Sequence, residues 1–242
     1  MILLLEWCER PDLGLSTDVY ADGDHPEGAY TDAMYGGVSR VVLDPDLLSR
    51  ALETGGDGSA AVISSNLVLT GTEFNCSGGW VEDGWVSCEE TDREQHGYAF
   101  LTRIDDDRVV RAEDRRIHSW GRLKREGVTV RSETGHVFMT EDHKNGCLYR
   151  FVPDEREDFM GPGSLQAMAI DGLSDTDPEV PLTEGSSWSV RWIDIPDPQA
   201  AERPCREQGV ELGATRFNRC EGNPVYNRFS RCLKMHISNR YS

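Results

Sequence analysis

The sequence predicts an all-β fold, and three features support this. Short stretches that alternate apolar and polar residues recur along the 242-residue chain, as in the stretch 188–192, WSVRW. Turn-forming residues separate these stretches, as in 144–146, KNG. Their spacing is typical of a sandwich, a barrel or a propeller. The expected strands are Met1–Leu5, Ala61–Leu69, Gly84–Cys88, Gly97–Ile104, Thr129–Arg131, His136–Thr140, Cys147–Val152 and Trp188–Ile195.

Two short helices are expected in inserted loops. The first opens at Asp44-Pro45, an N-cap residue followed by a first-turn proline, and closes at Gly55. The second is expected to start at Asp197 and to run toward Gly209, with a kink or an end at Pro204. The stretch 154–184 is rich in Gly, Pro, Asp and Ser, which indicates a long loop.

Charge and composition exclude several classes of protein. The formal net charge is −18, and the body of the chain has no basic stripe, so a nucleic-acid partner is not expected. No apolar stretch is long enough to cross a bilayer, and Met1–Leu5 is too short for a signal peptide. The seven cysteines include no CxxC pair, which argues against a zinc ribbon. An excess of carboxylates suits either solubility or the binding of hard cations such as calcium.

The chain is expected to form a single domain over residues 1–222, followed by an atypical tail over 223–242. The tail contains Arg228, Arg231, Lys234 and Arg240 but no acidic residue, unlike the rest of the chain. It also lacks the alternation of a strand. We therefore expect the tail to lie outside the pattern of the domain core.

Acidic and sulfur-bearing residues recur at the ends of the expected strands, where loops often carry function. Several carboxylates together suit a hard cation, and one thiolate among them suits iron. Arg219 and Glu221 are two positions apart and would share a strand face, where Arg219 could hold a phosphate. Simpler interpretations remain: solvated glutamates, cysteines buried as small core residues, or a disulfide between Cys76 and Cys88.

Several motifs, in this order, resemble those of the PhoX-type alkaline phosphatase family. That resemblance implies a β-propeller whose central funnel holds iron and calcium ions and which hydrolyses phosphomonoesters. Members of the family are typically periplasmic or secreted, although no signal peptide is seen in this sequence. Family members have first and last strands with no counterpart here, so the resemblance predicts a propeller truncated at both ends. The matching stretches are GTEFNCSGG, VSCEE, HGYAF, GRLKREG, FMTEDHKNGCLYRFVP and GATRFNRCEG, with YGGVSRVVLDP and WIDIPDPQA as further, weaker ones.

The resemblance also assigns roles to individual residues. Arg219 matches an arginine that meets phosphate, and Glu126 matches the glutamate of a His-Glu motif; these two are the expected catalytic residues. The histidine of that motif is replaced here by Arg125. Cys76 matches an iron-binding cysteine, which leaves Cys88 as a core strand residue. The residues expected to bind metal are Cys76, Glu89, Glu90, Glu126, Glu141, Asp142 and Glu221.

The predicted function is therefore metal-dependent hydrolysis of a phosphorylated small molecule by a monomer. One alternative is a catalytically inactive or degenerate propeller that binds calcium or a partner. Another is a calcium-dependent propeller hydrolase such as a lactonase, which would not need Cys76. Metal content separates these hypotheses, because only the phosphatase is expected to hold iron together with calcium.

Overall fold

Strands dominate the computed structural model, which describes residues 1–7, 27–31, 34, 36–173 and 187–222. The two α-helices described are α1 (Pro45–Thr54) and α2 (Cys205–Glu211), and short 3₁₀ turns lie at Ser59–Ala61, Ala112–Asp114 and His118–Trp120. The strands are β1 (Ile2–Trp7), β2 (Gly36–Leu43), β3 (Val62–Thr72), β4 (Asn75–Val81), β5 (Gly84–Glu89), β6 (Ala99–Arg103), β7 (Arg125–Val130), β8 (Val137–Glu141), β9 (Leu148–Pro153), β10 (Gly163–Ile170) and β11 (Val190–Asp194).

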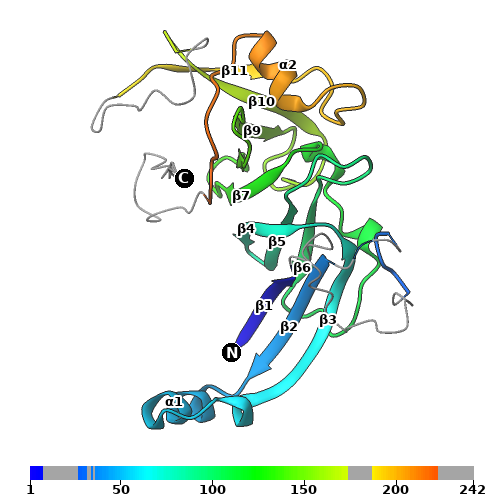
Figure 1. The fold of residues 1–242 in the computed structure, drawn as a ribbon, viewed down its shortest axis with the longest axis vertical. Helices are drawn as coiled ribbons and strands as arrows, with labels where there is room; N and C mark the ends of the chain where they lie inside the picture. The colour runs from blue at the N-terminus through cyan, green and yellow to red at the C-terminus, as the bar shows by residue number, and fades with distance from the viewer. Residues whose placement is uncertain (8–26, 32–33, 35, 174–186, 223–242) are drawn as a thin grey trace.

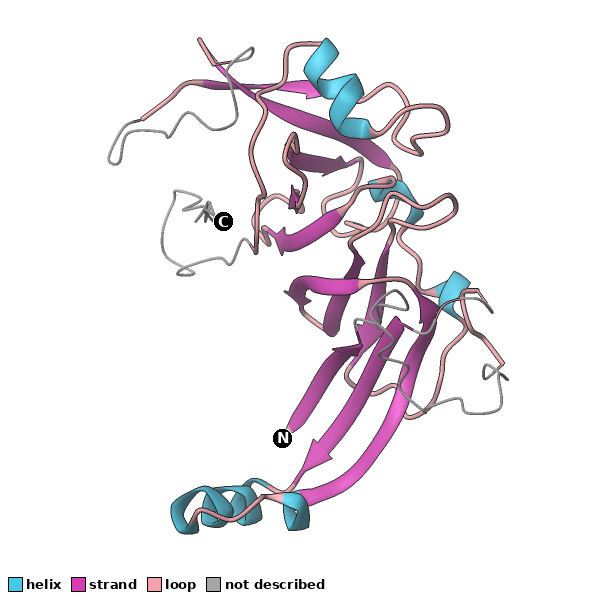
Figure 2. Cartoon of the chain, viewed as in Figure 1, coloured by secondary structure: helices cyan, strands magenta, loops and turns pink. Residues whose placement is uncertain are grey.

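The described strands form three antiparallel sheets in which each strand pairs with its neighbour in sequence. The orders are β1-β2-β3, β4-β5-β6 and β7-β8-β9-β10-β11. The sheets follow one another along the long axis of the molecule, with α1 at one end and α2 at the other (Figures 1 and 2). This arrangement confirms the all-β prediction. The propeller and the single domain over residues 1–222 remain predictions, and the tail 223–242 lies outside the described residues.

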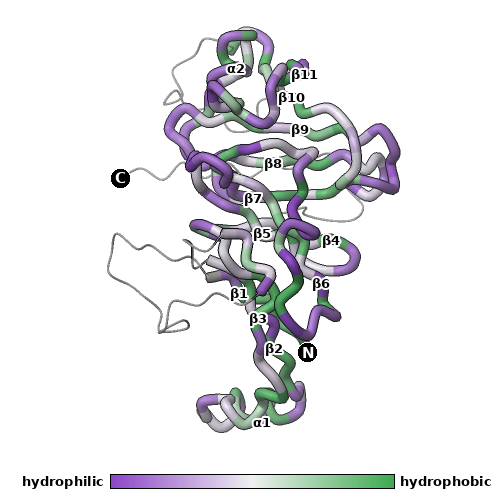
Figure 3. Tube along the Cα trace, turned by 90° about the vertical axis from the view of Figure 1, so that its right-hand side faces the viewer, coloured by the Kyte–Doolittle hydropathy of each residue, from purple (hydrophilic) through white to green (hydrophobic). Residues whose placement is uncertain are grey.

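The second and third sheets share the largest hydrophobic core. Val86 and Leu101 of the second sheet belong to the same buried cluster as Met139 and Phe151 of the third sheet, together with Trp120 from the turn between them. The loops at the edges of the third sheet are largely hydrophilic (Figure 3). Burial of this shared core is expected to hold the two sheets in a fixed relation, because buried apolar area is the dominant stabilising term.

The first helix forms as predicted. The side chain of Asp44 accepts hydrogen bonds from the backbone N–H groups of Asp46 and Leu47, and Gly55 ends the helix in the left-handed conformation. The helix lies between β2 and β3 at the end of the first sheet (Figure 1). None of its residues is buried.

Two predictions of local structure were wrong. Pro204 does not end a helix but precedes α2 as its N-cap residue, a position where the missing N–H of proline removes no helical hydrogen bond. The expected loop 154–184 contains β10, whose alternation was hidden by the glycines and proline just before it. Residues 174–184 of that stretch lie outside the described residues. No helix in the described part of the chain has the length and apolar character needed to cross a membrane.

Glu6 connects the first sheet to the second. The indole N–H of Trp85 donates to a carboxylate oxygen of Glu6 at 3.0 Å. Burial raises the pKa of Glu6 to about 7, against the opposing effect of hydrogen bonds from Ser87, Trp85 and the backbone of Cys88. The folded protein therefore binds a proton at Glu6 that the unfolded chain releases at lower pH.

We expect this carboxyl to make stability fall with rising pH. The contribution of protonated Glu6 is fully present below about pH 4.5 and is lost as the pH rises to about 7, by no more than about 3 kcal/mol. Glu6→Gln should reduce the difference between the free energies of unfolding at about pH 5 and about pH 8, measured with urea. The exposed Glu82→Gln is the matched control. Equal pH dependence in Glu6→Gln and wild type would contradict the expectation.

Candidate metal centre

Two β-bulges set the positions of Cys76 and Glu126. Between β4 and β5 the pairs are Asn75 with Glu89 and then Gly78 with Ser87, so β4 carries one extra residue around Cys76. Between β7 and β8 the pairs are Arg125 with Glu141 and then Val128 with Met139, which places a second bulge around Glu126. Bulges redirect side chains and are frequent next to active sites. Each bulge therefore changes the direction of a side chain that was expected to bind metal, Cys76 in β4 and Glu126 in β7.

The two bulged strands pack directly against each other. A Cβ atom on Gly79 of β4 would lie 2.0 Å from the carbonyl oxygen of Val128 of β7, so only glycine permits this approach. Gly79 and Val128 each lie just beyond the bulge of their own strand. Their contact therefore brings the bulge of the second sheet beside that of the third sheet.

Glu90 completes a three-residue cluster. It follows β5 directly and forms an isolated β-bridge with Lys124, the residue before β7. One potential ligand atom each from Cys76, Glu90 and Glu126 lie within 4.8 Å of one another. The structure thus brings together a thiol and two carboxylates from the second and third sheets.

The electrostatics of this cluster favour a bound cation. Burial raises the pKa of Glu126 to about 7, and the carboxylates of Glu90, Glu221 and Asp142 raise this pKa further. The hydrogen bond with Cys76 acts to lower it. Burial and the charges of Glu126 and Glu90 raise the pKa of the Cys76 thiol. A cation at this point would favour the thiolate and the ionised carboxylates, because a metal reverses these local effects.

Asp142 and Arg219 lie beside the cluster. Asp142 follows β8, and its carboxylate contributes to raising the pKa of both Glu90 and Glu126. A guanidinium nitrogen of Arg219 lies 3.3 and 3.2 Å from the two carboxylate oxygens of Asp142. The Arg219 side chain is 54% exposed, so it is accessible to a ligand.

The segment that carries Arg219 and Glu221 runs along the β8–β9 turn. Phe217 bridges Gly146, and the backbone N–H of Arg219 donates to the carbonyl of His143 at 3.1 Å. The Thr140 hydroxyl accepts a hydrogen bond from Gly127 N–H in the β7 bulge and donates to the carbonyl of Glu221. Thr140 therefore fixes residue 221 relative to the bulge that carries Glu126.

Glu89 is turned away from this cluster. Its carboxylate accepts hydrogen bonds from the backbone N–H groups of Glu73, Gly97 and Tyr98 and contacts the ring nitrogen Nδ1 of His96 at 2.7 Å. The side chain is fully buried. These contacts give Glu89 a structural role in holding the β5–β6 connection.

Glu141 is likewise engaged elsewhere. Its carboxylate pairs with Arg206 of α2 at 2.9 Å and accepts hydrogen bonds from the Tyr149 hydroxyl and the backbone of Cys147. The same guanidinium of Arg206 also pairs with Asp92. Glu141 therefore anchors α2 to the third sheet, and the structure does not bring it into the cluster with Cys76.

Arg125, the residue before Glu126, is buried in the core and lies outside the cluster. Its guanidinium is fully buried and donates to the backbone carbonyls of Gly97, Trp120 and Gly121 at 3.1 Å each. The residue that replaces the histidine of the family's His-Glu motif is therefore a core residue and does not crowd the cluster.

Lys124 is a site residue that the sequence analysis missed. Its ammonium group donates to Glu90 Oε1 at 2.6 Å, at the rim of the cluster. Its closeness in sequence to Glu126, two residues away, is the signal that could have pointed to it. Gly79 lies in β4, which was not among the expected strands, so its close backbone contact was missed as well.

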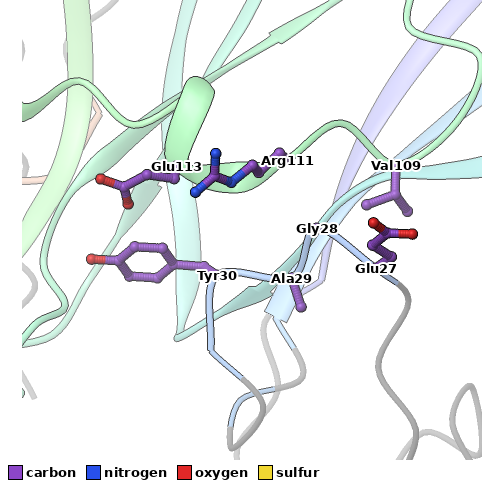
Figure 4. Close-up of a pocket in the computed structure, with 7 residues that line it drawn as sticks. All are labelled: Glu27, Gly28, Ala29, Tyr30, Val109, Arg111 and Glu113. Carbon is purple, nitrogen blue, oxygen red and sulfur yellow. The ribbon is translucent and has the colours of Figure 1, made fainter.

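Two other possibilities are resolved by the structure. Cys76 and Cys88 are both free thiols, so they form no disulfide, and Cys88 is buried in the core of the second sheet. A surface hollow of about 800 Å³ lies elsewhere, with Tyr30 beside Glu113 at one end and Glu27 beside Val109 at the other (Figure 4). None of the described residues that line this hollow belongs to the cluster.

Comparison with known proteins decides the family. A family model described as alkaline phosphatase PhoX matches residues 54–231, more than half of the chain. The chain belongs to the alkaline phosphatase PhoX family. Every residue nominated from the PhoX resemblance lies inside the matched range. The resemblance found in the sequence is thereby confirmed.

One solved structure of a PhoX protein is also similar. It is Pseudomonas fluorescens PhoX in complex with vanadate, a transition state analogue, with 16% sequence identity and a TM-score of 0.42. The match covers 77% of this chain and 46% of that chain, so this PhoX-family chain spans less than half of the length of that protein. Comparison with curated proteins finds no match.

Proposed function

We propose that this chain supplies the metal centre and phosphate-binding arginine of a phosphatase that hydrolyses phosphomonoesters. The observation that carries the proposal is the convergence of Cys76, Glu90 and Glu126, with Asp142 and Arg219 beside them. Membership of the PhoX family supports the reaction class. We also propose that the three sheets belong to a propeller whose funnel holds this centre.

The donor set fits a mixed iron and calcium site. A thiolate with carboxylates suits iron, whereas a group of carboxylate oxygens suits calcium. Cys76, Glu90 and Glu126 would hold the iron, with Asp142 and Glu221 supplying further oxygen ligands. When bound, the ions would polarise the phosphoryl oxygens and activate an oxygen nucleophile. Glu89 and Glu141, with all their described contacts inside the protein, are assigned to structural roles in this proposal.

Arg219 would bind the phosphoryl group. A guanidinium presents a planar fork that matches phosphate oxygens, and this one is more than half exposed. Its partner Asp142 would orient the fork and offset its charge before the substrate arrives. Arg219 would then stabilise the negative charge on the transferring group.

Metal analysis with an activity assay tests the function. The purified chain is dialysed, its iron and calcium contents are measured, and hydrolysis of p-nitrophenyl phosphate is followed with and without added calcium. We expect retained iron and calcium-stimulated turnover. Calcium alone would favour the lactonase-type hydrolase, and no retained metal would favour a non-catalytic role; either result would contradict the phosphatase proposal.

Arg219→Ala is expected to weaken phosphate binding about 10- to 100-fold and to leave metal content unchanged, because a charge-assisted bidentate contact is worth about 1.5–3 kcal/mol. Inhibition by inorganic phosphate measures the first effect and elemental analysis measures the second. The exposed Arg216, three residues away, gives the matched control Arg216→Ala. Phosphate inhibition equal in both variants would rule out this role for Arg219.

A further inference from the structure

Lys124 lies where three elements of the proposed centre meet. It precedes β7, and its backbone forms the isolated bridge with Glu90 at the end of β5. Its carbonyl accepts a hydrogen bond from the N–H of Asp142, just after β8, at 3.1 Å. The backbone of Lys124 is thus bonded to the segments that carry two of the proposed ligands.

The side chain of Lys124 makes a second set of links to the same two residues. Its Nζ donates to Glu90 Oε1 at 2.6 Å and to the backbone carbonyl of Asp142 at 2.8 Å, and lies 3.9 Å from the Asp142 carboxylate. The Lys124 side chain is 23% exposed, and those of Glu90 and Asp142 are each 12% exposed. Charge-assisted hydrogen bonds between partly buried groups are stronger than those of an exposed ion pair.

We propose that Lys124 is a positioning residue for the metal centre. This inference rests on the proposed function and adds a residue to it. By holding one oxygen of Glu90, the ammonium group fixes the plane of the carboxylate, and the other oxygen would then be the one that binds a cation. By holding the Asp142 carbonyl, it keeps the end of β8 at the same point. Removal of a group that orients a metal ligand in this way typically lowers metal affinity about 10- to 100-fold.

The two cations beside Asp142 differ in a way that supports separate roles. Lys124 is mostly buried and makes its short contacts to Glu90 and to the Asp142 carbonyl, whereas Arg219 is 54% exposed and contacts the Asp142 carboxylate at 3.2 and 3.3 Å. A buried, multiply bonded cation is suited to orientation. An exposed cation with longer contacts can move toward a ligand at lower energetic cost. Lys124 therefore orients ligands, and Arg219 remains available for the phosphoryl group.

Iron titration of the full chain tests the role of Lys124. Ferric iron is added to the metal-depleted protein, and the visible thiolate-to-iron absorption band is recorded for wild type, Lys124→Met, Lys124→Arg and the exposed control Lys144→Met. We expect Lys124→Met to weaken iron binding about 10- to 100-fold. Lys124→Arg should restore most of the affinity, since it keeps a cationic donor. Lys144→Met should match wild type.

The outcomes separate the two proposals. Unchanged iron affinity in Lys124→Met would overturn the positioning role, and tighter binding would identify the ammonium group as a competitor of the metal instead. Absence of the band in wild type would overturn the metal centre itself, and the role of Lys124 with it. Thermal unfolding verifies that each variant folds. If Lys124→Met does not fold, Lys124→Gln replaces it with the same expected direction.

Discussion

Replacement of Cys76 by serine is expected to lower iron affinity by more than about 100-fold, since loss of an outer partner alone costs about 10- to 100-fold. A serine hydroxyl does not ionise at neutral pH and is a poor ligand for iron compared with a thiolate. Phosphatase activity should be lost with the metal. The fold should be retained, because Cys76 is only partly buried and the change in volume is small.

Elemental analysis and the visible absorption band measure this loss. Cys88→Ala is the matched control, because Cys88 lies on β5, the neighbour of the Cys76 strand, but is fully buried in the core and is not among the three clustered residues. It should keep full iron content at a modest loss of stability. Full iron occupancy in Cys76→Ser would show that the thiol is not a ligand.

The largest expected effect on stability is that of Arg125→Met, which should lower the free energy of unfolding by about 3 kcal/mol. The substitution removes three hydrogen bonds to backbone carbonyls, and a buried polar group left without its partner costs about 1–3 kcal/mol. It also removes a positive charge that interacts with the buried Glu141 and Glu89, both of which act to raise the pKa of Arg125. Methionine fills part of the space and removes the desolvation cost of the guanidinium, which limits the loss.

Urea unfolding at fixed pH measures the change. The matched control is Arg131→Met, just beyond the end of the same strand, where the arginine side chain forms an exposed pair with Glu133. That control should stay within about 0.5 kcal/mol of wild type. Equal stabilities of the two variants would mean that the buried guanidinium contributes no net stabilisation, as happens when apolar groups replace some buried charges.

Most of the strands and the first helix could be predicted from local patterns, whereas β2, β4 and β10 were not among the expected strands. The expected strand Gly84–Cys88 corresponds to β5 with one residue added, and the capping residues of α1 act as expected. Errors arose where a glycine or proline signal had two meanings. Pro204 can end one helix or open another, and only the packing of α2 against β10 and Glu141 selects the second.

The sequence by itself determined the family, the all-β class and the set of chemical groups from which a metal site could be built. It did not distinguish between adjacent carboxylates, because Glu89 and Glu141 each end a strand and Glu90 and Asp142 directly follow them. Tertiary contacts made that choice. Backbone amides with His96 hold Glu89, and Arg206 holds Glu141, in the interior.

The convergence of Cys76 with Glu126 was also decided only by the tertiary structure. It depends on two bulges and on the contact between Gly79 and Val128, residues 49 positions apart in sequence. Local patterns indicate which residues lie on a strand. Whether two strands pack together depends on tertiary structure, here on the bulges and on a glycine whose lack of a side chain lets the two backbones approach.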